Sequence, residues 1–271
     1  MVNEIANFAA NFKTMRAKEL IGTTLLLMLI SGAFAANPIG NIVTTEPPDK
    51  LPEATKDSLE VTLSADIRNR HTWRGGLTCD AWNFQPTLNF TWSNFLVGVW
   101  GVYTVDNKYA EVDFYASYTY KSFTLSVLDY FCPNETLAVN RFFDYNDQTT
   151  PHLIDINLQF NGTKSFPVRI LASTIVYGND KKADDPNKNN YSTYFEAGYN
   201  FASKKGFKYD FVVGLTPFES FYSNRLNVVN MGFKASKKIK ITPSYSLPVF
   251  GQLVLNPYKE NLHFVFGITI E

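Results

Sequence analysis

At residues 59–68 the chain reads LEVTLSADIR, in which apolar and polar side chains alternate without a break. Successive side chains of an extended chain point to opposite faces, so this stretch predicts a strand with one apolar and one polar face. The same period of two returns at intervals up to the last residues. The later stretches that share it are 84–92, 111–120, 154–160, 191–201 and 262–271. Alternation along most of the chain predicts an all-β protein.

The connections between the predicted strands form two sets that take turns along the chain. The first set is short and consists of residues 93–94, 121–122, 161–166, 203–206 and 237–240. The second set contains long members, at 74–81, 131–151, 178–190 and 216–224, and two short ones, around Asn107 and at 257–260. A soluble β-sandwich has strands with the same alternation. Short turns on one rim and longer loops on the other are typical of an up-and-down, antiparallel transmembrane β-barrel, which we predict with about twelve strands over residues 58–271.

Aromatic side chains collect beside the short connections. Trp and Tyr prefer a membrane–water boundary, because the body of the ring is apolar and its polar tip stays wet. An ordinary aromatic core at the strand ends of a soluble protein is the alternative. The residues concerned are Trp92, Phe95, Tyr118, Tyr120, Phe123, Phe201 and Phe207.

The first 35 residues have the features of an export signal. Basic residues at positions 13, 16 and 18 precede an apolar stretch at 20–34, and the small-x-small triplet Ala33-Phe34-Ala35 follows. This pattern predicts a signal peptide at residues 1–35 that is cleaved after Ala35; an uncleaved anchor helix is the alternative. Residues 36–57 contain several prolines and predict a periplasmic linker. We therefore expect the protein in the outer membrane of a Gram-negative cell.

Two motifs resemble those of a known family. The first is Thr72-Trp73-Arg74-Gly75, just after the first predicted strand, and the second is an ExDxYxxY pattern at residues 111–118. Together they resemble a functionally uncharacterised family of exported Gram-negative conserved hypothetical proteins of the outer-membrane β-barrel type. The likeness covers the first third of the mature chain well and continues mainly as strand pattern. It implies an exported, β-rich protein and lends no activity.

Charge balance and missing motifs argue against several functions. The chain has 25 Lys and Arg against 25 Asp and Glu, whereas nucleic-acid binding needs a basic surplus. It contains no Gly-x-Ser-x-Gly elbow, no HExxH and no paired CxxC. We therefore assign no catalytic residue, no metal ligand and no cofactor. A Ser–His pair in a barrel that acts on membrane lipid stays an alternative, without a particular serine to support it.

Charged side chains occur on the polar face of several predicted strands. Ionised groups face lipid only at high cost, so in a membrane barrel they must line the interior. There they would form a charged pore or polar binding site, or else a network of ion pairs that merely fills the barrel. The candidates are Glu60, Asp66, Arg68, Arg70, Glu111, Asp113 and Glu196.

The connection at residues 131–151 is too long and too rich in aromatic and charged residues for an idle linker. Its candidate residues are Arg141, Phe142, Phe143 and Tyr145. Folded inward they would narrow the interior, and turned outward they would bind a partner. On the same side of the molecule, Cys79 and Cys132 form either a disulfide between the first connection of the second set and its long third connection, or two separate thiols.

Two stretches interrupt the regular pattern. Residues 95–103 and 168–177 are apolar on both faces, so either the interior has an apolar wall there or something covers the outside. Pro243 and Pro248 fall inside a predicted strand, where each removes a ladder donor. We therefore expect a bulge or a weak seam near the C-terminus.

Two functions of different class are consistent with these features. The first is a small outer-membrane channel or binding barrel for small polar solutes. The alternative is a non-conducting structural or assembly component that binds a partner, such as another outer-membrane protein, through its outer loops. An outer-membrane enzyme that acts on lipid has weaker support. Outer-membrane lipid is an expected partner in each case.

Overall fold

The computed structural model describes residues 58–133 and 139–271. The predicted signal peptide and linker lie outside the described residues. The strands are β1 (Leu59–Arg68), β2 (His71–Trp73), β3 (Gly76–Cys79), β4 (Asn83–Trp92), β5 (Phe95–Thr104), β6 (Ala110–Tyr120), β7 (Phe123–Phe131), β8 (His152–Phe160), β9 (Val168–Gly178), β10 (Thr193–Ala202), β11 (Phe207–Thr216), β12 (Asn227–Lys240), β13 (Ser246–Asn256) and β14 (Asn261–Ile270). Among the described residues, no helix has both the length and the apolar character needed to cross a bilayer.

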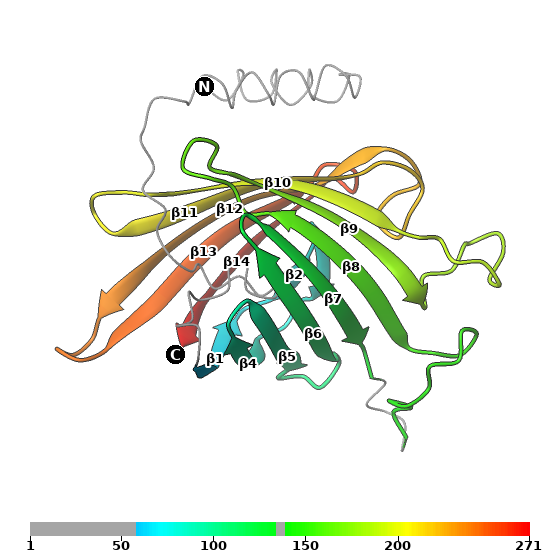
Figure 1. The fold of residues 1–271 in the computed structure, drawn as a ribbon, viewed down its shortest axis with the longest axis horizontal. Coiled ribbons are helices and arrows are strands. Elements are labelled where there is room, and N and C mark those ends of the chain that lie inside the picture. The colour runs from blue at the N-terminus through cyan, green and yellow to red at the C-terminus, as the bar shows by residue number, and fades with distance from the viewer. Residues whose placement is uncertain (1–57, 134–138) are drawn as a thin grey trace. The chain divides into compact units, whose positions relative to one another are not determined.

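Twelve of these strands form one closed antiparallel barrel, which confirms the predicted fold class and strand number (Figure 1). Strands that are consecutive around the barrel are neighbours in sequence, except that β1 pairs with β4, and β14 pairs with β1 to close the ring. We call the rim that carries the β4–β5, β6–β7, β8–β9, β10–β11 and β12–β13 connections the turn rim. The opposite rim, with the remaining connections, is the loop rim. The start of β1 and the end of β14 both lie toward the turn rim.

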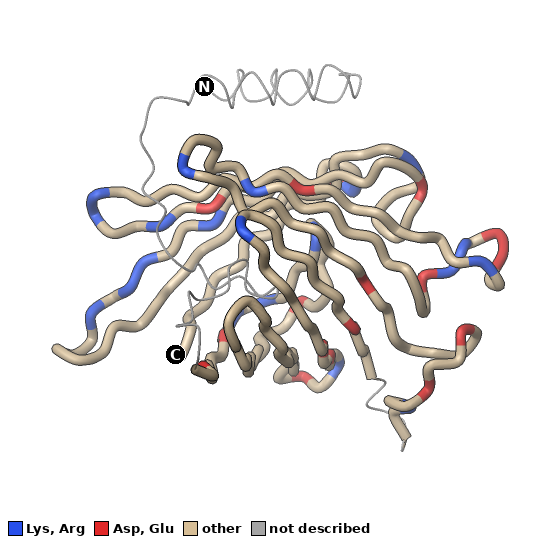
Figure 2. Tube along the Cα trace, viewed as in Figure 1, with Lys and Arg blue, Asp and Glu red and all other residues tan. Residues whose placement is uncertain are grey.

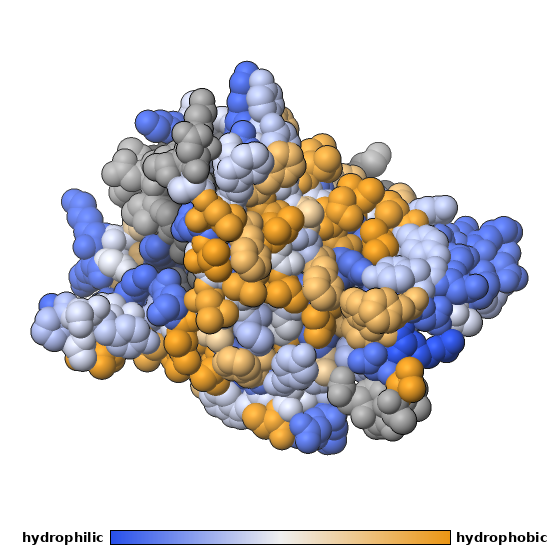
Figure 3. Space-filling model, turned by 60° about the horizontal axis from the view of Figure 1, so that its bottom comes forward, coloured by the Kyte–Doolittle hydropathy of each residue, from blue (hydrophilic) through white to orange (hydrophobic). Residues whose placement is uncertain are grey.

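The alternation of side chains separates an apolar outer face from a polar inner face. On β1, the outward Leu59 and Leu63 are 62% and 70% exposed, whereas the inward Asp66 and Arg68 are 3% and 2% exposed. The same division holds on the other strands, where outward Phe, Leu, Val and Ile side chains are among the most exposed apolar groups. Figure 3 shows the result on one face, an apolar band with hydrophilic regions on either side. Figure 2 shows many charged positions in the connections and near the strand ends, with long uncharged runs between them.

The aromatic residues beside the turn rim lie on this outer face. Trp92, Phe95, Tyr120 and Phe123 are each more than half exposed. Phe95 also packs against Tyr118 of the neighbouring strand, with ring centroids 4.6 Å apart. These rings therefore surround the barrel exterior and do not form a core between two sheets.

The closing seam is the shortest ladder of the barrel. Only Ala65–Arg68 of β1 pairs with Gly267–Ile270 of β14, in line with a weak seam near the C-terminus. Pro248 lies in β13 beside it, and the β13–β14 ladder begins one residue later, at Val249. The expectation for Pro243 was wrong, because β12 continues to Lys240 and Pro243 lies in the turn that follows.

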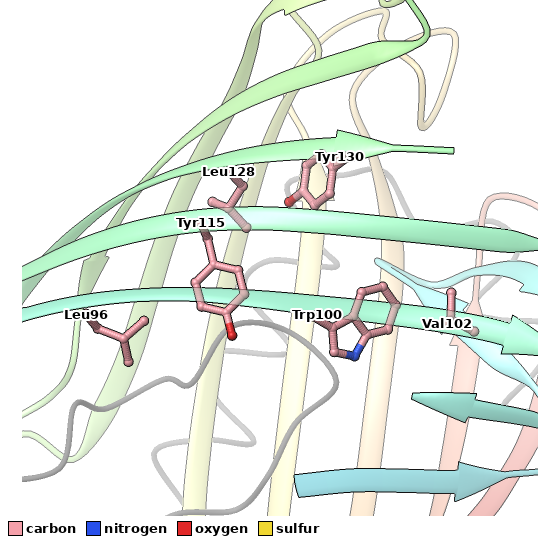
Figure 4. Packing of buried hydrophobic residues seen from close by; sticks show 6 residues of the cluster. All are labelled: Leu96, Trp100, Val102, Tyr115, Leu128 and Tyr130. Carbon is pink, nitrogen blue, oxygen red and sulfur yellow. The ribbon is translucent and has the colours of Figure 1, made fainter. Parts of the chain in front are cut away.

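The stretches that are apolar on both faces form an apolar part of the inner wall. Leu96, Trp100 and Val102 of β5 point inward and pack with Tyr115, Leu128 and Tyr130 of β6 and β7 (Figure 4). Leu171 and Ile175 of β9 are buried in the same way. The interior therefore has an apolar side on β5–β7, while most of its charged side chains stand on other strands.

Candidate functional site

The first connection at the loop rim is a β-hairpin. β2 pairs with β3, with Trp73 opposite Gly76, so that Arg74 and Gly75 form a two-residue turn. Both have positive φ, 46° for Arg74 and 80° for Gly75, as the type I′ turn of a tight hairpin requires. Glycine adopts this conformation freely, whereas for arginine it costs about 1 kcal/mol. The contacts of the arginine side chain must offset that cost.

This hairpin, residues 71–79, lies among the barrel strands (Figure 1), and its tip contacts the wall at β8 and β12. The ring of Trp73 lies 5.5 Å from the ring of Tyr130 on β7. At the tip, Arg74 contacts Asp155 on β8. In the strand order, β8 and β10 lie across the ring from β1 and β4, from which the hairpin starts. We call it the plug hairpin.

The plug hairpin is held by an ion pair that water hardly reaches. Arg74 Nη2 donates to Asp155 Oδ2 at 2.8 Å, and the two side chains are 2% and 0% exposed. Arg74 Nη1 donates to the hydroxyl of Tyr222. Asp155 also accepts from Ser173 Oγ at 2.8 Å and from the Tyr130 hydroxyl at 3.2 Å. Removing one partner of such a pair leaves a buried charge uncompensated, which costs about 3–5 kcal/mol.

Aromatic rings surround the Arg74 guanidinium. Its Cζ lies 4.6 Å from the ring centroid of Trp73, 4.9 Å from that of Tyr194 and 5.7 Å from that of Tyr222. The electron-rich faces of these rings attract a cation, by about 2 kcal/mol or more where water is excluded. Burial raises the pKa of Tyr222, so its hydroxyl stays neutral beside the guanidinium. The three aromatic rings and the Asp155 carboxylate therefore stabilise the same guanidinium group.

The second residue of the turn touches the barrel wall directly at β12. A Cβ atom placed on Gly75 would overlap the backbone carbonyl of Val229 and approach the Cα of Asn230. Val229 is the extra residue of a β-bulge, because Gly214 of β11 pairs with Asn230 and Leu215 pairs with Val228. Bulges bend a strand locally, and this one meets the tip of the plug hairpin. Only glycine fits between the turn and β12.

The base of the plug hairpin is joined to β1, β4 and β5. His71 is buried, and its Nδ1 lies 3.2 Å from Gln85 Nε2. Gln85 Oε1 accepts from Arg68 Nη1 at 3.3 Å. The imidazole also lies against Trp100, with ring centroids 5.3 Å apart. These contacts make the docked position of the hairpin sensitive to the charge of His71.

Docking of the plug hairpin is expected to weaken in acid. Burial, reinforced by the charge of Arg68, lowers the pKa of His71 from 6.5 to about 3. The docked state therefore binds fewer protons than the undocked state between these values, so its stability is complete above pH 6.5 and falls toward pH 3. The expected loss is at most about 1.4 kcal/mol per pH unit. Urea unfolding of the wild type and of His71→Gln at pH 7.5, 6, 5 and 4 measures it, and equal slopes for both proteins would contradict it.

The predicted lining residues of β1, β6 and β10 lie on the inner face in separate groups. Asp66 accepts from Thr269 Oγ1 at 2.6 Å. Glu111 accepts from the Tyr109 hydroxyl at 2.5 Å, and Glu196 accepts from the Tyr194 hydroxyl at 2.6 Å. The structure does not bring the groups into one cluster, because β4 and β5 lie between β1 and β6.

The remaining candidates of the predicted lining differ in burial. Arg68 and Asp113 are buried, whereas Glu60 and Arg70 are half-buried. Glu60 stands at the turn-rim end of β1, and Arg70 follows β1 and pairs with Asp80 at 3.0 Å. Beside Glu196, Arg169 on β9 lies 3.6 Å from that carboxylate and 3.7 Å from Asp210 on β11. Sequence reasoning missed Arg169.

The third connection of the loop rim, residues 131–151, does not narrow the interior in its described part. The inward alternative for its candidate residues is therefore wrong; these residues are Arg141, Phe142, Phe143 and Tyr145. Phe142 packs on Phe114, which points outward from β6. The reason is Asp129, an acid on the outer face of β7. Tyr145 donates to it at 2.7 Å, and His152 Nδ1 lies 2.7 Å from it. The loop folds over the outside because this carboxylate needs partners there.

The other two candidates of this connection remain at the surface. Arg141 forms an ion pair with Asp144 at 3.0 Å. Phe143 is 89% exposed, which makes it the most exposed large apolar residue among the described positions.

Both cysteines are free thiols, so the second alternative, two separate thiols, describes this structure. Cys79 lies in β3, 3.8 Å from Asn83 Nδ2. Cys132 lies just beyond β7, 3.8 Å from the Tyr109 hydroxyl. The plug hairpin is thus held by Arg74 and not by a covalent bond to the third connection.

No catalytic pair involving His152 is assembled, although this residue is fully buried beside Asp129. Its second ring nitrogen, Nε2, lies 2.7 Å from the backbone oxygen of Phe142, so both nitrogens are engaged and none faces a serine. Among residues 58–133 and 139–271, no three His, Cys, Asp or Glu side chains are arranged to hold a metal ion.

The turn of the plug hairpin lies within the motif Trp73-Arg74-Gly75, but sequence reasoning did not predict that this segment enters the barrel. Two glycines after Arg74, flanked by Thr72 and Trp73 before and Leu77 and Thr78 after, are a hairpin signal. No local signal shows that this hairpin turns inward, because its ion-pair partner Asp155 lies 81 residues away.

No family model and no curated protein sequence matches this chain.

Proposed function

We propose that this chain is an exported outer-membrane β-barrel whose interior is gated by the plug hairpin. One observation supports the location: around a closed ring of strands, apolar side chains are exposed on the outside while most ionised ones are enclosed. Water would favour the opposite arrangement, and lipid favours this one. In a closed barrel every strand edge is paired in lipid, apart from the ends of a staggered seam.

The position of the plug hairpin supports a barrel that is closed at rest. The hairpin starts between β1 and β4, and its tip contacts β8 and β12. It therefore lies across the interior through which small polar solutes would have to pass. The buried Arg74–Asp155 pair stabilises this closed state, and release of the hairpin would open a path lined by polar side chains. The barrel is then a gated channel or binding barrel for small polar solutes.

A closed structural component is the second candidate, and one observation favours it. Phe143 on the third connection is 89% exposed although the neighbouring Phe142 packs on Phe114 of the barrel wall. An exposed aromatic side chain on a loop that is anchored by Asp129 and Tyr145 suits contact with a partner protein. In this candidate the plug hairpin never leaves the barrel.

The location is tested by fractionation and by gel mobility. We expect the protein in the outer-membrane fraction, and we expect unboiled samples to migrate differently from boiled ones, because a closed barrel without long free edges resists detergent. Recovery in the soluble periplasmic fraction, with one mobility for both samples, would contradict the proposal.

A lysine on the outer face is expected to be harmful only if that face meets lipid. Val127 lies in the middle of β7, points outward and is 44% exposed. Val127→Lys should lower the free energy of folding into lipid vesicles by about 2–4 kcal/mol, whereas on a water-exposed surface the change is usually within about 0.5 kcal/mol. Val139→Lys, at a 70% exposed loop position, is the matched control. Equal, small effects of both would place this face in water.

A further inference from the structure

The barrel wall around Asp155 holds a cation, which in this structure is the guanidinium of Arg74 from the plug hairpin. Asp155 on β8 is fully buried, and two wall residues orient its carboxylate: Ser173 on β9 donates at 2.8 and 2.9 Å, and Tyr130 on β7 donates at 3.2 Å. The rings of Tyr194 on β10 and of Tyr222 face the Arg74 guanidinium that binds this carboxylate. The hairpin adds Trp73 and the cation itself.

This combination has the chemistry of an organic-cation receptor. A carboxylate whose other oxygen contacts are hydroxyl groups directs its remaining acceptor capacity toward a charged donor. Tyrosine faces at 4.9 and 5.7 Å attract a delocalised, weakly hydrated cation such as guanidinium. The Tyr222 hydroxyl takes a second N–H from the same group, Nη1, while Asp155 takes Nη2. Two acceptors for two nitrogens of one planar group favour guanidinium over a compact ammonium.

We infer that the Asp155 site binds small solutes that carry a guanidinium group, and that Arg74 occupies it as a built-in competitor. The inference rests on the proposed function in that it names the solute class for the same interior. A solute guanidinium and the Arg74 guanidinium exclude each other, because both need Asp155 Oδ2. Binding of the solute therefore displaces the tip of the plug hairpin, and the solute opens its own path.

Competition between Arg74 and a free solute for the Asp155 carboxylate sets the expected affinity for the solute. Arg74 is tethered through a short connection, which gives it an effective concentration on the order of millimolar or above. A free guanidinium solute must overcome that concentration in the wild type. Removing the Arg74 side chain lifts the competition, so the variant should bind the same solute at least tenfold more tightly.

The test is calorimetric titration of the full chain in detergent with agmatine, a small guanidinium compound. We expect Arg74→Ala to bind agmatine at least tenfold more tightly than the wild type, and Arg74→Ala/Asp155→Asn to lose that gain. N-(4-aminobutyl)urea, which keeps the amine and the planar head group of agmatine but not the charge of that head group, should show no gain. Arg225→Ala, an exposed arginine in the same connection as Tyr222, should behave like the wild type.

Gly75→Val is the second variant, in case Arg74→Ala does not fold. It excludes the hairpin tip from the wall and leaves every residue of the Asp155 site unchanged, so it should also gain agmatine binding. Agmatine binding that is no tighter in the folded variant than in the wild type, or equal binding of N-(4-aminobutyl)urea, would overturn the inference. Because the titration needs neither a membrane nor a conducting barrel, its result stands apart from that of the proposed function.

Discussion

Arg74→Ala is expected to convert a silent planar bilayer into a conducting one. The substitution removes the partner of the fully buried Asp155 and the cation from between three aromatic rings. Water then stabilises the charge of Asp155, and water reaches this carboxylate most freely when the hairpin has left. Breaking a buried pair costs about 3–5 kcal/mol, and each 1.4 kcal/mol is about tenfold in an equilibrium constant. The open fraction should rise at least a hundredfold.

Single-channel recording of the purified protein measures this effect. Arg225→Ala serves as the control, because it removes an exposed arginine near Tyr222 without touching the ion pair. Asp155→Asn should open the barrel as well, since it leaves Arg74 without its buried carboxylate. The double variant should be less disturbed than the sum of the two single variants, because neither charge is left alone. Wild-type and Arg74→Ala membranes that are both silent would favour the closed structural component.

Gly75→Val is expected to open the barrel with both charges of the ion pair still present. Gly75 has a φ of 80°, and a Cβ there would overlap the backbone of Val229 on β12. A β-branched side chain is strained at positive φ, and the barrel backbone cannot move aside to admit it. The hairpin must therefore stay out of its docking place. We expect an open fraction comparable to that of Arg74→Ala.

Gly251→Ala is the matched control, because a Cβ on this β13 glycine meets only Phe264 at an ordinary 3.5 Å. Heat-modifiable mobility of both variants shows that the barrel itself has formed. If Gly75→Val stays as silent as Gly251→Ala while both fold, the hairpin tip does not control the path, and a gate must be sought elsewhere in the barrel.

The two predictions separate electrostatics from shape. Arg74→Ala keeps the fit of the turn and removes the charge, whereas Gly75→Val keeps the charge and removes the fit. A gate that depends on both should respond to either change. A response to Arg74→Ala alone would mean that the charge holds a hairpin whose tip has room to move.

The barrel could be predicted because its pattern is local. Leu59, Val61 and Leu63 alternate with polar neighbours, and five later stretches of the chain repeat the same two-residue rule. Side chains of extended chain alternate between faces whatever the tertiary structure, so six such stretches, together with short turns on one rim, leave few other architectures. The inward direction of Asp66, Arg68, Glu111 and Asp113 follows from the same rule.

What fills the barrel could not be predicted, because it depends on pairs that are distant in sequence. The length and composition of residues 131–151 drew attention to the third connection, but length does not give direction. Asp129, an acid on the outer face of β7, binds Tyr145 and holds that connection outside. The first connection turns inward because Arg74 finds Asp155, 81 residues away, on a strand that only the closed ring places opposite. Local alternation along the chain is enough to specify the barrel wall. The docking of the plug hairpin depends on the tertiary structure, because a buried charge is stable only where the fold brings its partner to it.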